Sequence, residues 1–519
     1  MRDFTPQDAG PGRIREWIDR AARLYPDKPY VVSVEDGRSI SYAQFAELTR
    51  RLATFLHGEG IATNDRIALF AGNSIEHVAC FVGVMAYGAT ICTVHVEMNR
   101  HHLGRIMAQL KPRLAIHDDE HGDLARAEIA TDGAAKCFAL GRWDTPQPGT
   151  LFAAVGRCAP HDADLPATGP RDDGVILFTS GTSDRPKGVV LSYREHIGNI
   201  EPMTHAFGMS SADRVYDFRS FNWSSGQSLG VLGPLAHGAT LVMAKRFSAS
   251  RFLDDLRSHR VTIAAGNPTT INMLLNTEQR IDAKDLPELR FITSSSAPLA
   301  PQEWRRFEER SGIAVAQGYG SSETAWIAAN PGRERRIGSV GKPLAYHRLA
   351  IVDALGRSVP AGEIGEVEVG AFDDNAYRYL GDDGAVEVAG RGRWRTGDMG
   401  FLDADGFLHL AGREKELIIR GGVNISPVEI DGVLMQRAEI AEAATVGVPD
   451  RIWGEEVVSY VVLRPGMGFA PDELMAFCAT QLPAFKTPKQ ILLRDKLPKS
   501  ERGKLDRKAL VAEWRRGRS

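Results

Sequence analysis

The chain has 519 residues, 43% of them hydrophobic and 25% charged, so it is long enough for two or more hydrophobic cores. Its 63 Lys and Arg nearly balance 66 Asp and Glu, and the formal net charge of -3 excludes the strongly basic surface typical of a nucleic-acid-binding protein. The five cysteines are scattered without a C-x-x-C pair, which favours free thiols in a reducing, cytoplasmic compartment over a disulfide framework.

Two features argue against a secreted or membrane-inserted chain. Residues 1–4 lack the apolar core of a signal peptide. The longest apolar stretch, residues 78–94, is interrupted by Gly83 and Gly88 and is shorter than the about 20 apolar residues that span a bilayer. We therefore interpret this stretch as a buried helix that leads into a buried strand.

Helix and strand patterns alternate along the first two thirds of the chain. Residues 45–56 carry apolar side chains at helical spacing after a possible N-cap at Ser41, and residues 65–70 predict a strand. Residues 118–170 are polar and rich in Asp, Pro and Gly, which predicts a connection between subdomains. The predicted elements that follow are the strand 175–179, the strand 189–191 and a helix capped by Ser192.

The alternation continues to about residue 330 and is typical of largely parallel, helix-covered sheets. Residues 351–353 and 364–369 predict strands of a smaller β subdomain. The last hundred residues predict a separate small α/β unit with strands at 417–419 and 457–463 and a helix from Asp472. Within that unit Ser426, Pro427 and Glu429 together predict a helix start with a capping box.

The most informative motif is LFTSGTSDRPKG at residues 177–188. Backbone N–H groups of a glycine-rich turn converge on an anion, and hydroxyls and a lysine add further donors, so the motif predicts a polyphosphate cradle. It is not a Walker A loop, because Gly188 follows Lys187 where that motif has Ser or Thr. The alternative is a flexible hydrophilic loop. The residues of the predicted cradle that would bind the phosphates are Thr179, Ser180, Gly181, Thr182, Ser183 and Lys187.

Two further motifs fit a nucleotide. In QGYGSSET (residues 317–324), Tyr319 offers a flat face to a base and Glu323 is a hard oxygen ligand that suits Mg²⁺. In WRTGD (residues 394–398), Asp398 stands on a tight turn and can accept both hydroxyls of a ribose. Ordinary Tyr-Gly and Asp turns explain each motif equally well in isolation.

Two motifs occupy the carboxy-terminal part. Residues 412–430 contain Gly421 and Gly422, which either let a slender thiol arm pass the backbone or form a hairpin turn, or both. The charged run at residues 498–507 contains Lys504 and is otherwise typical of a solvated surface.

In this order and spacing, the five motifs resemble those of the adenylate-forming, AMP-binding superfamily, which includes acyl-CoA synthetases, adenylation domains of peptide synthetases and luciferases. The resemblance runs from about residue 13 to residue 510. It implies an α/β fold: a large amino-terminal domain (1–412) of helix-covered, mostly parallel sheets plus a β subdomain, and a small mobile carboxy-terminal α/β domain (413–519) that carries the adenylation lysine.

The resemblance also implies a role for each motif residue. Lys504, Glu323 and Lys187 would be catalytic, and Glu323 would hold Mg²⁺. Beyond the phosphate loop, the ATP-binding residues would be Ser296, Ala297, Tyr319, Gly320, Ser322, Asp398, Arg413 and Lys504. Lys415 would be the hinge, and CoA would contact Arg420, Gly421 and Gly422. The acyl pocket would contain Asn222, Trp223, Gln227, Gln317 and Gly318.

The chain departs from the family pattern at two places. Asp184 stands where a glycine is usual in the phosphate loop, and residues 294–296 are serines where a Gly-Gly run is usual beside adenine. Asp tolerates a positive φ better than most residues. We therefore expect ATP binding to be retained, with an altered nucleotide affinity.

The predicted function is ATP-dependent ligation of a carboxylic acid to CoA through an acyl-adenylate, with Mg²⁺. A bulky ring at Trp223 among amides favours a short, polar or aromatic acid over a long alkyl chain. Arg219 either meets a second anionic group of the acid or pairs locally with Asp217. The alternatives are a carrier-protein thiol as acceptor, a luciferase-like oxidase and a non-catalytic nucleotide sensor. The sequence does not choose between a monomer and a homodimer.

Overall fold

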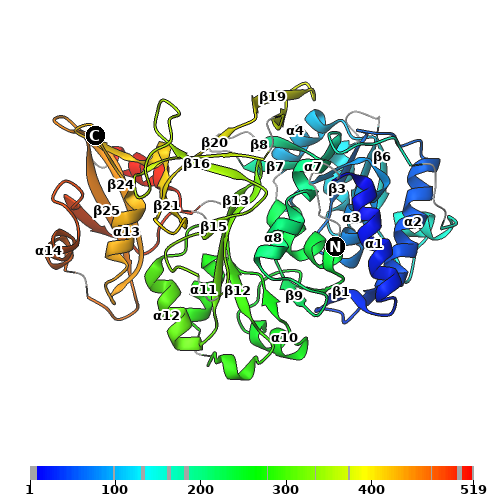
Figure 1. The fold of residues 1–519 in the computed structure, drawn as a ribbon, viewed down its shortest axis with the longest axis horizontal. Coiled ribbons are helices and arrows are strands. Elements are labelled where there is room, and N and C mark those ends of the chain that lie inside the picture. The colour runs from blue at the N-terminus through cyan, green and yellow to red at the C-terminus, as the bar shows by residue number, and fades with distance from the viewer. Residues whose placement is uncertain are drawn as a thin grey trace.

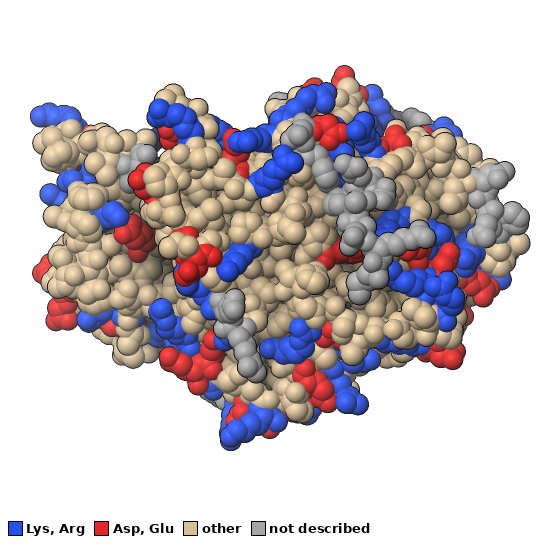
Figure 2. All heavy atoms as spheres, in the orientation of Figure 1, with Lys and Arg blue, Asp and Glu red and all other residues tan. Residues whose placement is uncertain are grey.

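The computed structural model describes residues 9–96, 100–129, 135–160, 165–180, 186–277, 279–332, 335–371, 374–468, 470–499 and 505–516. Their strands form four sheets, and the sheet that contains β24 and β25 lies at the opposite end of the molecule from β6 (Figure 1). Figure 2 shows both signs of charge spread over one face, as the nearly balanced composition predicts.

An eight-stranded sheet has the order β19-β18-β8-β7-β4-β3-β5-β6. Strands β7, β4, β3, β5 and β6 run parallel to their neighbours, whereas β8, β18 and β19 are added antiparallel. All residues of β4 and β5 are buried, as expected for parallel strands covered on both faces. The strands are β3 (Arg66–Phe70), β4 (Thr90–Thr93), β5 (Leu114–His117), β6 (Lys136–Ala139), β7 (Asp173–Ser180), β8 (Pro186–Ser192), β18 (Ala376–Leu380) and β19 (Val386–Arg391).

The prediction of a subdomain connection at residues 118–170 was wrong. This segment contains α5 (Gly122–Ile129), β6 and α6 (Leu151–Gly156), and β6 pairs in parallel with β5. It therefore extends the sheet instead of leaving it. The sequence hides the strand because β6 lies at the sheet edge, is only partly buried and is flanked by polar loops.

A nine-stranded sheet has the order β15-β14-β13-β12-β11-β9-β10-β1-β2. From β1 to β13 the pairs are parallel, and β14 and β15 return antiparallel, which confirms the expected mostly parallel sheets. The strands are β1 (Pro29–Ser33), β2 (Ser39–Ser41), β9 (Arg214–Asp217), β10 (Thr240–Met243), β11 (Ile263–Ala264), β12 (Phe291–Ser294), β13 (Val315–Ser321), β14 (Ala325–Asn330) and β15 (Lys342–Pro343).

Helices cover these two sheets, and their starts follow the predicted caps. Ser41 and Ser192 both form capping boxes, with Gln44 and Glu195. The apolar stretch 78–94 is the buried α3 followed by β4, and no helix of the described residues is long and apolar enough to cross a membrane. The helices are α1 (Pro11–Leu24), α2 (Tyr42–Gly58), α3 (Ile75–Tyr87), α4 (Arg100–Leu110), α7 (Tyr193–Ile197), α8 (Ile200–Ala206), the π-helix η2 (Gly226–Leu232), α9 (Gly233–His237), α10 (Phe252–Ser258), α11 (Pro268–Leu275), the 3-10 helix η3 (Ala283–Asp285) and α12 (Pro301–Ser311).

The predicted β subdomain is a four-stranded antiparallel sheet, and the last hundred residues form a small α/β unit with its own hydrophobic clusters. In Figure 1 this unit lies at the end of the molecule beside α12. The strands of the antiparallel sheet are β16 (Arg348–Val352), β17 (Gly365–Gly370), β20 (Trp394–Leu402) and β21 (Leu408–Arg413). The elements after this sheet are the 3-10 helix η4 (Glu414–Glu416), β22 (Ile418–Arg420), β23 (Val423–Ile425), α13 (Pro427–Leu434), β24 (Ile440–Asp450), β25 (Gly454–Leu463), α14 (Pro471–Gln481), β26 (Gln490–Leu493) and α15 (Arg507–Arg516).

The helix start at Ser426 is only partly as predicted. Ser426 accepts the backbone N–H of Glu429 at 3.2 Å and Pro427 occupies the first turn. The Glu429 carboxylate does not complete a capping box, because it accepts both of its bonds from Lys486 Nζ, at 2.7 and 2.8 Å. Lys486, which follows α14, thus binds the carboxylate that the local sequence predicts to cap the helix.

Candidate active site

The phosphate-loop motif lies at the turn between β7 and β8. Thr179 pairs with Lys187 across the hairpin and Ser180 pairs with Pro186, so both ends of the loop are fixed by the sheet. Gly181, Thr182 and Ser183 lie outside the described residues. The exposed Lys187 places its Nζ 5.7 Å from the ring centroid of Tyr379, within the range of a cation–π contact.

Tyr379 links this lysine to the predicted metal ligand. Its hydroxyl donates to Glu323 Oε1 at 3.1 Å, and burial together with the neighbouring carboxylate raises the pKa of Tyr379. Sequence patterns do not identify Tyr379 as a site residue, because β18 joins β8 from nearly two hundred positions further along the chain. The alternating strand pattern of residues 376–380 was the available signal, but it does not say which strand they join.

The predicted base and ribose residues meet each other directly. Tyr319 Oη donates to Asp398 Oδ2 at 2.6 Å, and Arg413 Nε lies 2.9 Å from Asp398 Oδ1. Asp398 lies opposite Arg413 in the β20–β21 pair, and Gly397 before it has φ +72°, a left-handed turn. Burial and the Asp398 charge raise the pKa of Tyr319. Three residues from three strands thus form one polar cluster.

The remaining predicted nucleotide residues lie after β12 and at the end of β13. Ser296 and Ala297 are exposed after β12, and Ser296 has φ +74°, a conformation that favours glycine and costs other residues roughly 1–2 kcal/mol. Gly320 accepts no side chain, because a Cβ there would lie 2.1 Å from the carbonyl oxygen of Ala325. Ser322 is half-buried next to Glu323.

The donor set fits a magnesium ion that is held mainly by a substrate. Glu323 is a half-buried carboxylate whose second oxygen, Oε2, has no hydrogen bond or ion pair among the described residues, whereas Oε1 accepts the Tyr379 hydroxyl. No group of three or more His, Cys, Asp and Glu among the described residues forms a closed metal cage. Mg²⁺ typically takes one or two carboxylates plus phosphate oxygens and water, so a single carboxylate beside a phosphate loop suits it.

The predicted acyl-pocket amides are buried and anchored by the backbone. Asn222 Nδ2 donates to the carbonyl of Ala71 at 3.0 Å, and Gln227 Nε2 donates to the carbonyl of Phe221 at 2.9 Å. Because a carbonyl only accepts, these contacts fix which amide atom is nitrogen. The oxygens Asn222 Oδ1 and Gln227 Oε1 have no hydrogen-bond partner among the described atoms.

The other predicted pocket residues come from two elements, the segment after β9 and strand β13. The half-buried Trp223 packs against His95, with ring centroids 4.9 Å apart. The sequence did not identify His95, because it follows β4, more than a hundred positions before Trp223. Gln317 and Gly318 are buried in β13. The side of Gly318 where a Cβ would stand is filled by the Trp326 ring, 2.2 Å from that position.

Arg219 takes the local partner. Its guanidinium donates to Asp217 through Nη2 at 2.6 Å and Nε at 3.0 Å, and Nη1 reaches Ser295 Oγ at 3.3 Å. Both side chains are buried. The bidentate carboxylate neutralises the guanidinium, so Arg219 does not present an uncompensated positive charge to the pocket.

The carboxy-terminal candidates stand on exposed turns. Gly421 (φ +58°) and Gly422 (φ +82°) form the two-residue turn between β22 and β23, which confirms the hairpin interpretation. Arg420 pairs with Glu456 at 2.6 Å and lies over the Trp453 ring. Lys415 is exposed in η4, between β21 and β22. Lys504 lies outside the described residues.

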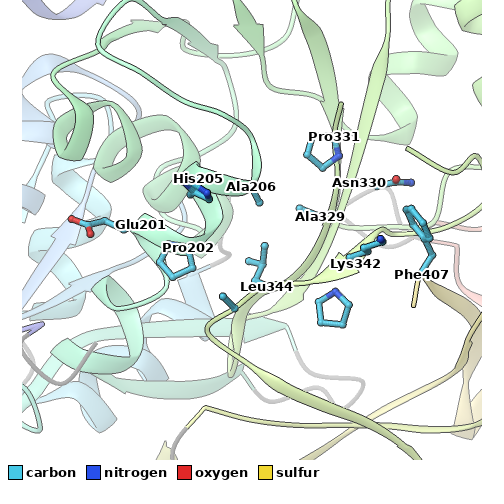
Figure 3. Close-up of a pocket in the computed structure, with 12 residues that line it drawn as sticks. Glu201, Pro202, His205, Ala206, Ala329, Asn330, Pro331, Lys342, Leu344 and Phe407 are labelled. Atoms are coloured by element: carbon cyan, nitrogen blue, oxygen red, sulfur yellow. The ribbon is translucent and has the colours of Figure 1, made fainter. Parts of the chain in front are cut away.

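A cavity of about 480 Å³ opens between α8, β14 and β15 (Figure 3). Glu201 and His205 from α8 line one side, and Lys342 and Phe407 line the other. None of the predicted site residues lines it, so this cavity is separate from the candidate active site. All five cysteines are unpaired.

Comparison with known proteins places the chain in a family. The AMP-binding enzyme family matches residues 18–371, and the AMP-binding enzyme C-terminal domain matches residues 429–504. The chain therefore belongs to the AMP-binding enzymes.

Two characterised relatives and one crystal structure illustrate the likeness. The chain is 34% identical over 499 residues to the sulfoacetate–CoA ligase of Cupriavidus necator, covering 95% of this chain and 96% of that protein. It is 32% identical over 511 residues to the indoleacetate–CoA ligase of Aromatoleum aromaticum, covering 96% and 98%. The ATP-bound crystal structure of MatB from Rhodopseudomonas palustris superposes with a TM-score of 0.83 at 26% identity, covering 96% and 99%.

Proposed function

We propose that this protein is an AMP-forming carboxylate–CoA ligase. The observation that carries the proposal is the arrangement around the end of β13. On one side Lys187, Tyr379 and Glu323 gather at the phosphate loop, and on the other Tyr319 and Asp398 meet at the base and ribose position. This arrangement suits a nucleoside triphosphate with its phosphates toward the loop.

The first step joins the acid to the nucleotide. A carboxylate oxygen forms a bond to the α-phosphorus of ATP while the bond to the pyrophosphate oxygen breaks. Both reactants are anions, so the protein contributes mainly positioning and compensating charge. Lys187 supplies a positive charge at the phosphate loop, and Lys504 would add a second positive charge. Glu323 would hold Mg²⁺, which supplies further positive charge to the phosphates when bound.

The second step transfers the acyl group to CoA. The sulfur of CoA forms a bond to the acyl carbonyl carbon, the thiol proton is lost, and AMP leaves with the bonding electrons. The β22–β23 hairpin supports an approach for the pantetheine arm, because Gly422 is exposed and a Cβ there would meet no atom within 4 Å. Arg420 at the base of this hairpin is held by Glu456.

The acid is proposed to be short and polar or aromatic. The Trp223 and His95 rings supply an apolar wall, and the buried amides of Asn222 and Gln227 supply polar atoms. The relatives named above act on sulfoacetate and indoleacetate, which are short acids with a polar and an aromatic substituent.

We further propose that the boundary between the two domains lies between residues 412 and 413, and that Lys415 is the hinge of a mobile carboxy-terminal domain. We also propose a cytoplasmic location. Support for the hinge comes from the exposed η4 turn that joins β21 to β22. Support for the location comes from the five unpaired cysteines.

The test is AMP release by the purified protein with MgATP and a panel of short polar, aromatic and long-chain acids, each with and without CoA. We expect AMP release that needs both a short polar or aromatic acid and CoA. Acid-dependent release that ignores CoA would point to a carrier-protein thiol as acceptor. No AMP with any acid would contradict the proposal.

A further inference from the structure

Tyr379 contacts two residues of the proposed active site at once. Its hydroxyl donates to Glu323 Oε1 at 3.1 Å, and its ring faces Lys187 Nζ, 5.7 Å from the centroid. We propose that Tyr379 is a positioning residue that holds the Glu323 carboxylate for the metal ion and keeps it apart from the Lys187 ammonium. This inference rests on the proposed function, because it assigns the roles of metal ligand and phosphate contact to these two residues.

The position of Tyr379 is set by the sheet and not by the site. In the antiparallel pair of β18 with β8 it lies opposite Val189, two residues after Lys187. The next residue back, Arg378, forms a partly buried ion pair with Asp173, which fastens β18 to β7. Trp394 lies beside the ring, with centroids 6.3 Å apart. The tyrosine therefore presents its hydroxyl with little freedom left to lose on binding.

The hydroxyl orients the carboxylate. It donates to one oxygen of Glu323 and leaves the other oxygen for a cation. A carboxylate on a turn otherwise rotates freely, and a fixed ligand loses less entropy when the metal binds. Removing the hydroxyl should therefore weaken the binding of ATP in the presence of Mg²⁺ more than the binding of ATP without metal.

The ring separates two opposite charges. Lys187 and Glu323 both contact Tyr379, and no ion pair joins them to each other in the described part of the chain. A direct pair would neutralise the groups that the phosphates and the metal require. The aromatic face instead attracts the ammonium without transferring a proton or quenching the carboxylate.

The experiment compares two tyrosines of the same strand. Tyr379→Phe removes the hydroxyl and keeps the ring. Tyr377→Phe is the matched control, because Tyr377 also stands on β18 and donates its hydroxyl to the backbone carbonyl of Val369 at 3.3 Å. Calorimetry measures the affinity of each protein for ATP without metal and with saturating Mg²⁺, and the ratio of the two affinities is the readout.

We expect Tyr379→Phe to lower the Mg²⁺-dependent gain in ATP affinity roughly 10-fold, the effect of losing one hydrogen bond to a charged group. Affinity without metal and the Tyr377→Phe ratio should both match the wild type. In a Glu323→Gln background, Tyr379→Phe should have no further effect, because the two side chains act together.

Equal ratios for the two tyrosine variants, or equal weakening of ATP with and without Mg²⁺, would overturn the inference. These outcomes are distinguishable from failure of the proposed function. If the wild type releases AMP with an acid and CoA but the ratio does not change, the role of Tyr379 alone fails. If the wild type binds ATP with no gain from Mg²⁺, the assigned metal role of Glu323 fails as well.

Discussion

The large amino-terminal part and the carboxy-terminal part hold their predicted site residues in different ways. In the large part these residues are held by contacts with other strands: Tyr319 donates to Asp398, and Glu323 accepts from Tyr379, which the sequence did not identify. In the carboxy-terminal part Lys415, Gly421 and Gly422 stand on exposed turns. The first arrangement is preorganised for a nucleotide, whereas the second is suited to delivering groups from outside.

The two parts are joined by the chain at η4 and by a polar contact. Arg464, after β25, places Nη2 3.0 Å from Oε1 of the buried Glu303 on α12. Polar contacts between domains are compatible with relative motion of the two domains. The difference is therefore consistent with our proposal that the large part binds the nucleotide and the carboxy-terminal part supplies a further lysine.

The largest effect should come from the residue that the carboxy-terminal part delivers. Lys504→Ala should lower acyl-AMP formation by roughly 10²–10³-fold, because one preorganised charge on the reacting phosphate is lost. Thiolysis of supplied acyl-AMP should stay nearly intact if the domain turns away for that step. Rapid-quench assays of the two half-reactions measure this, and equal loss in both would contradict delivery by domain motion.

The comparison extends to acid stability. All 14 histidines precede residue 410, and burial lowers the pKa of His77, His196 and His347 from 6.5 to about 4. The unfolded chain binds these protons below pH 6.5 while the folded chain does not, so stability is full above pH 6.5 and is lost as the pH falls toward 4. At pH 5 each histidine should cost about 2 kcal/mol of unfolding free energy in the large part.

His196 isolates this effect, because neither ring nitrogen has a hydrogen-bond partner among the described atoms. In His196→Leu the difference in unfolding free energy between pH 7 and pH 5 should shrink by about 2 kcal/mol. Urea denaturation at both pH values measures it. Phe81→Leu is the packing control, since its ring lies 6.2 Å from His196 and does not titrate. An undiminished difference in His196→Leu would reject the assignment.

Within the large part, the acyl side should respond separately from the nucleotide side. Trp223→Ala should raise KM for the preferred acid about 10-fold, because the ring that packs on His95 is lost. KM for ATP should hardly change, and Trp223→Phe should keep most of the acid affinity. Steady-state kinetics with each substrate varied in turn decides this, and an unchanged acid KM would remove Trp223 from the pocket.

The smallest effect should come from the contact between the parts. Glu303→Gln weakens the bond to Arg464, worth about 1 kcal/mol for a partly buried pair, so the orientation seen here becomes several-fold less favoured. One half-reaction should slow and the other should quicken. Glu309→Gln, on the exposed face of the same helix, is the control. Equal changes in both half-reactions would argue against a role of the Glu303–Arg464 contact in setting the orientation of the two parts.

Local sequence predicted what depends on neighbouring residues. The caps at Ser41 and Ser192, the hairpin at Gly421 and Gly422, and the buried helix before β4 all follow from short patterns. Pairings between distant segments could not be predicted in this way. Tyr379 reaches Glu323 only because β18 adds to a sheet whose strands, apart from β18 and β19, all precede residue 193.

The two errors have the same physical origin. The edge strand β6 has no fully buried residue and therefore gives no clear apolar pattern. It is a strand because it forms hydrogen bonds with β5 in the folded sheet. Glu429 leaves the predicted capping box because Lys486, 57 positions away, offers a charged donor. In both cases a tertiary contact outweighs the local preference.

The most direct test of the account is a single-turnover experiment with labelled acid, MgATP and excess wild-type protein. Without CoA, we expect close to one acyl-AMP to form per molecule of labelled acid and to stay bound, because the proposed adenylation step needs only the acid, MgATP and the protein. Addition of CoA should then convert it to the thioester with release of AMP. Failure to form acyl-AMP before CoA is added, or release of AMP without any acid, would contradict the two-step account.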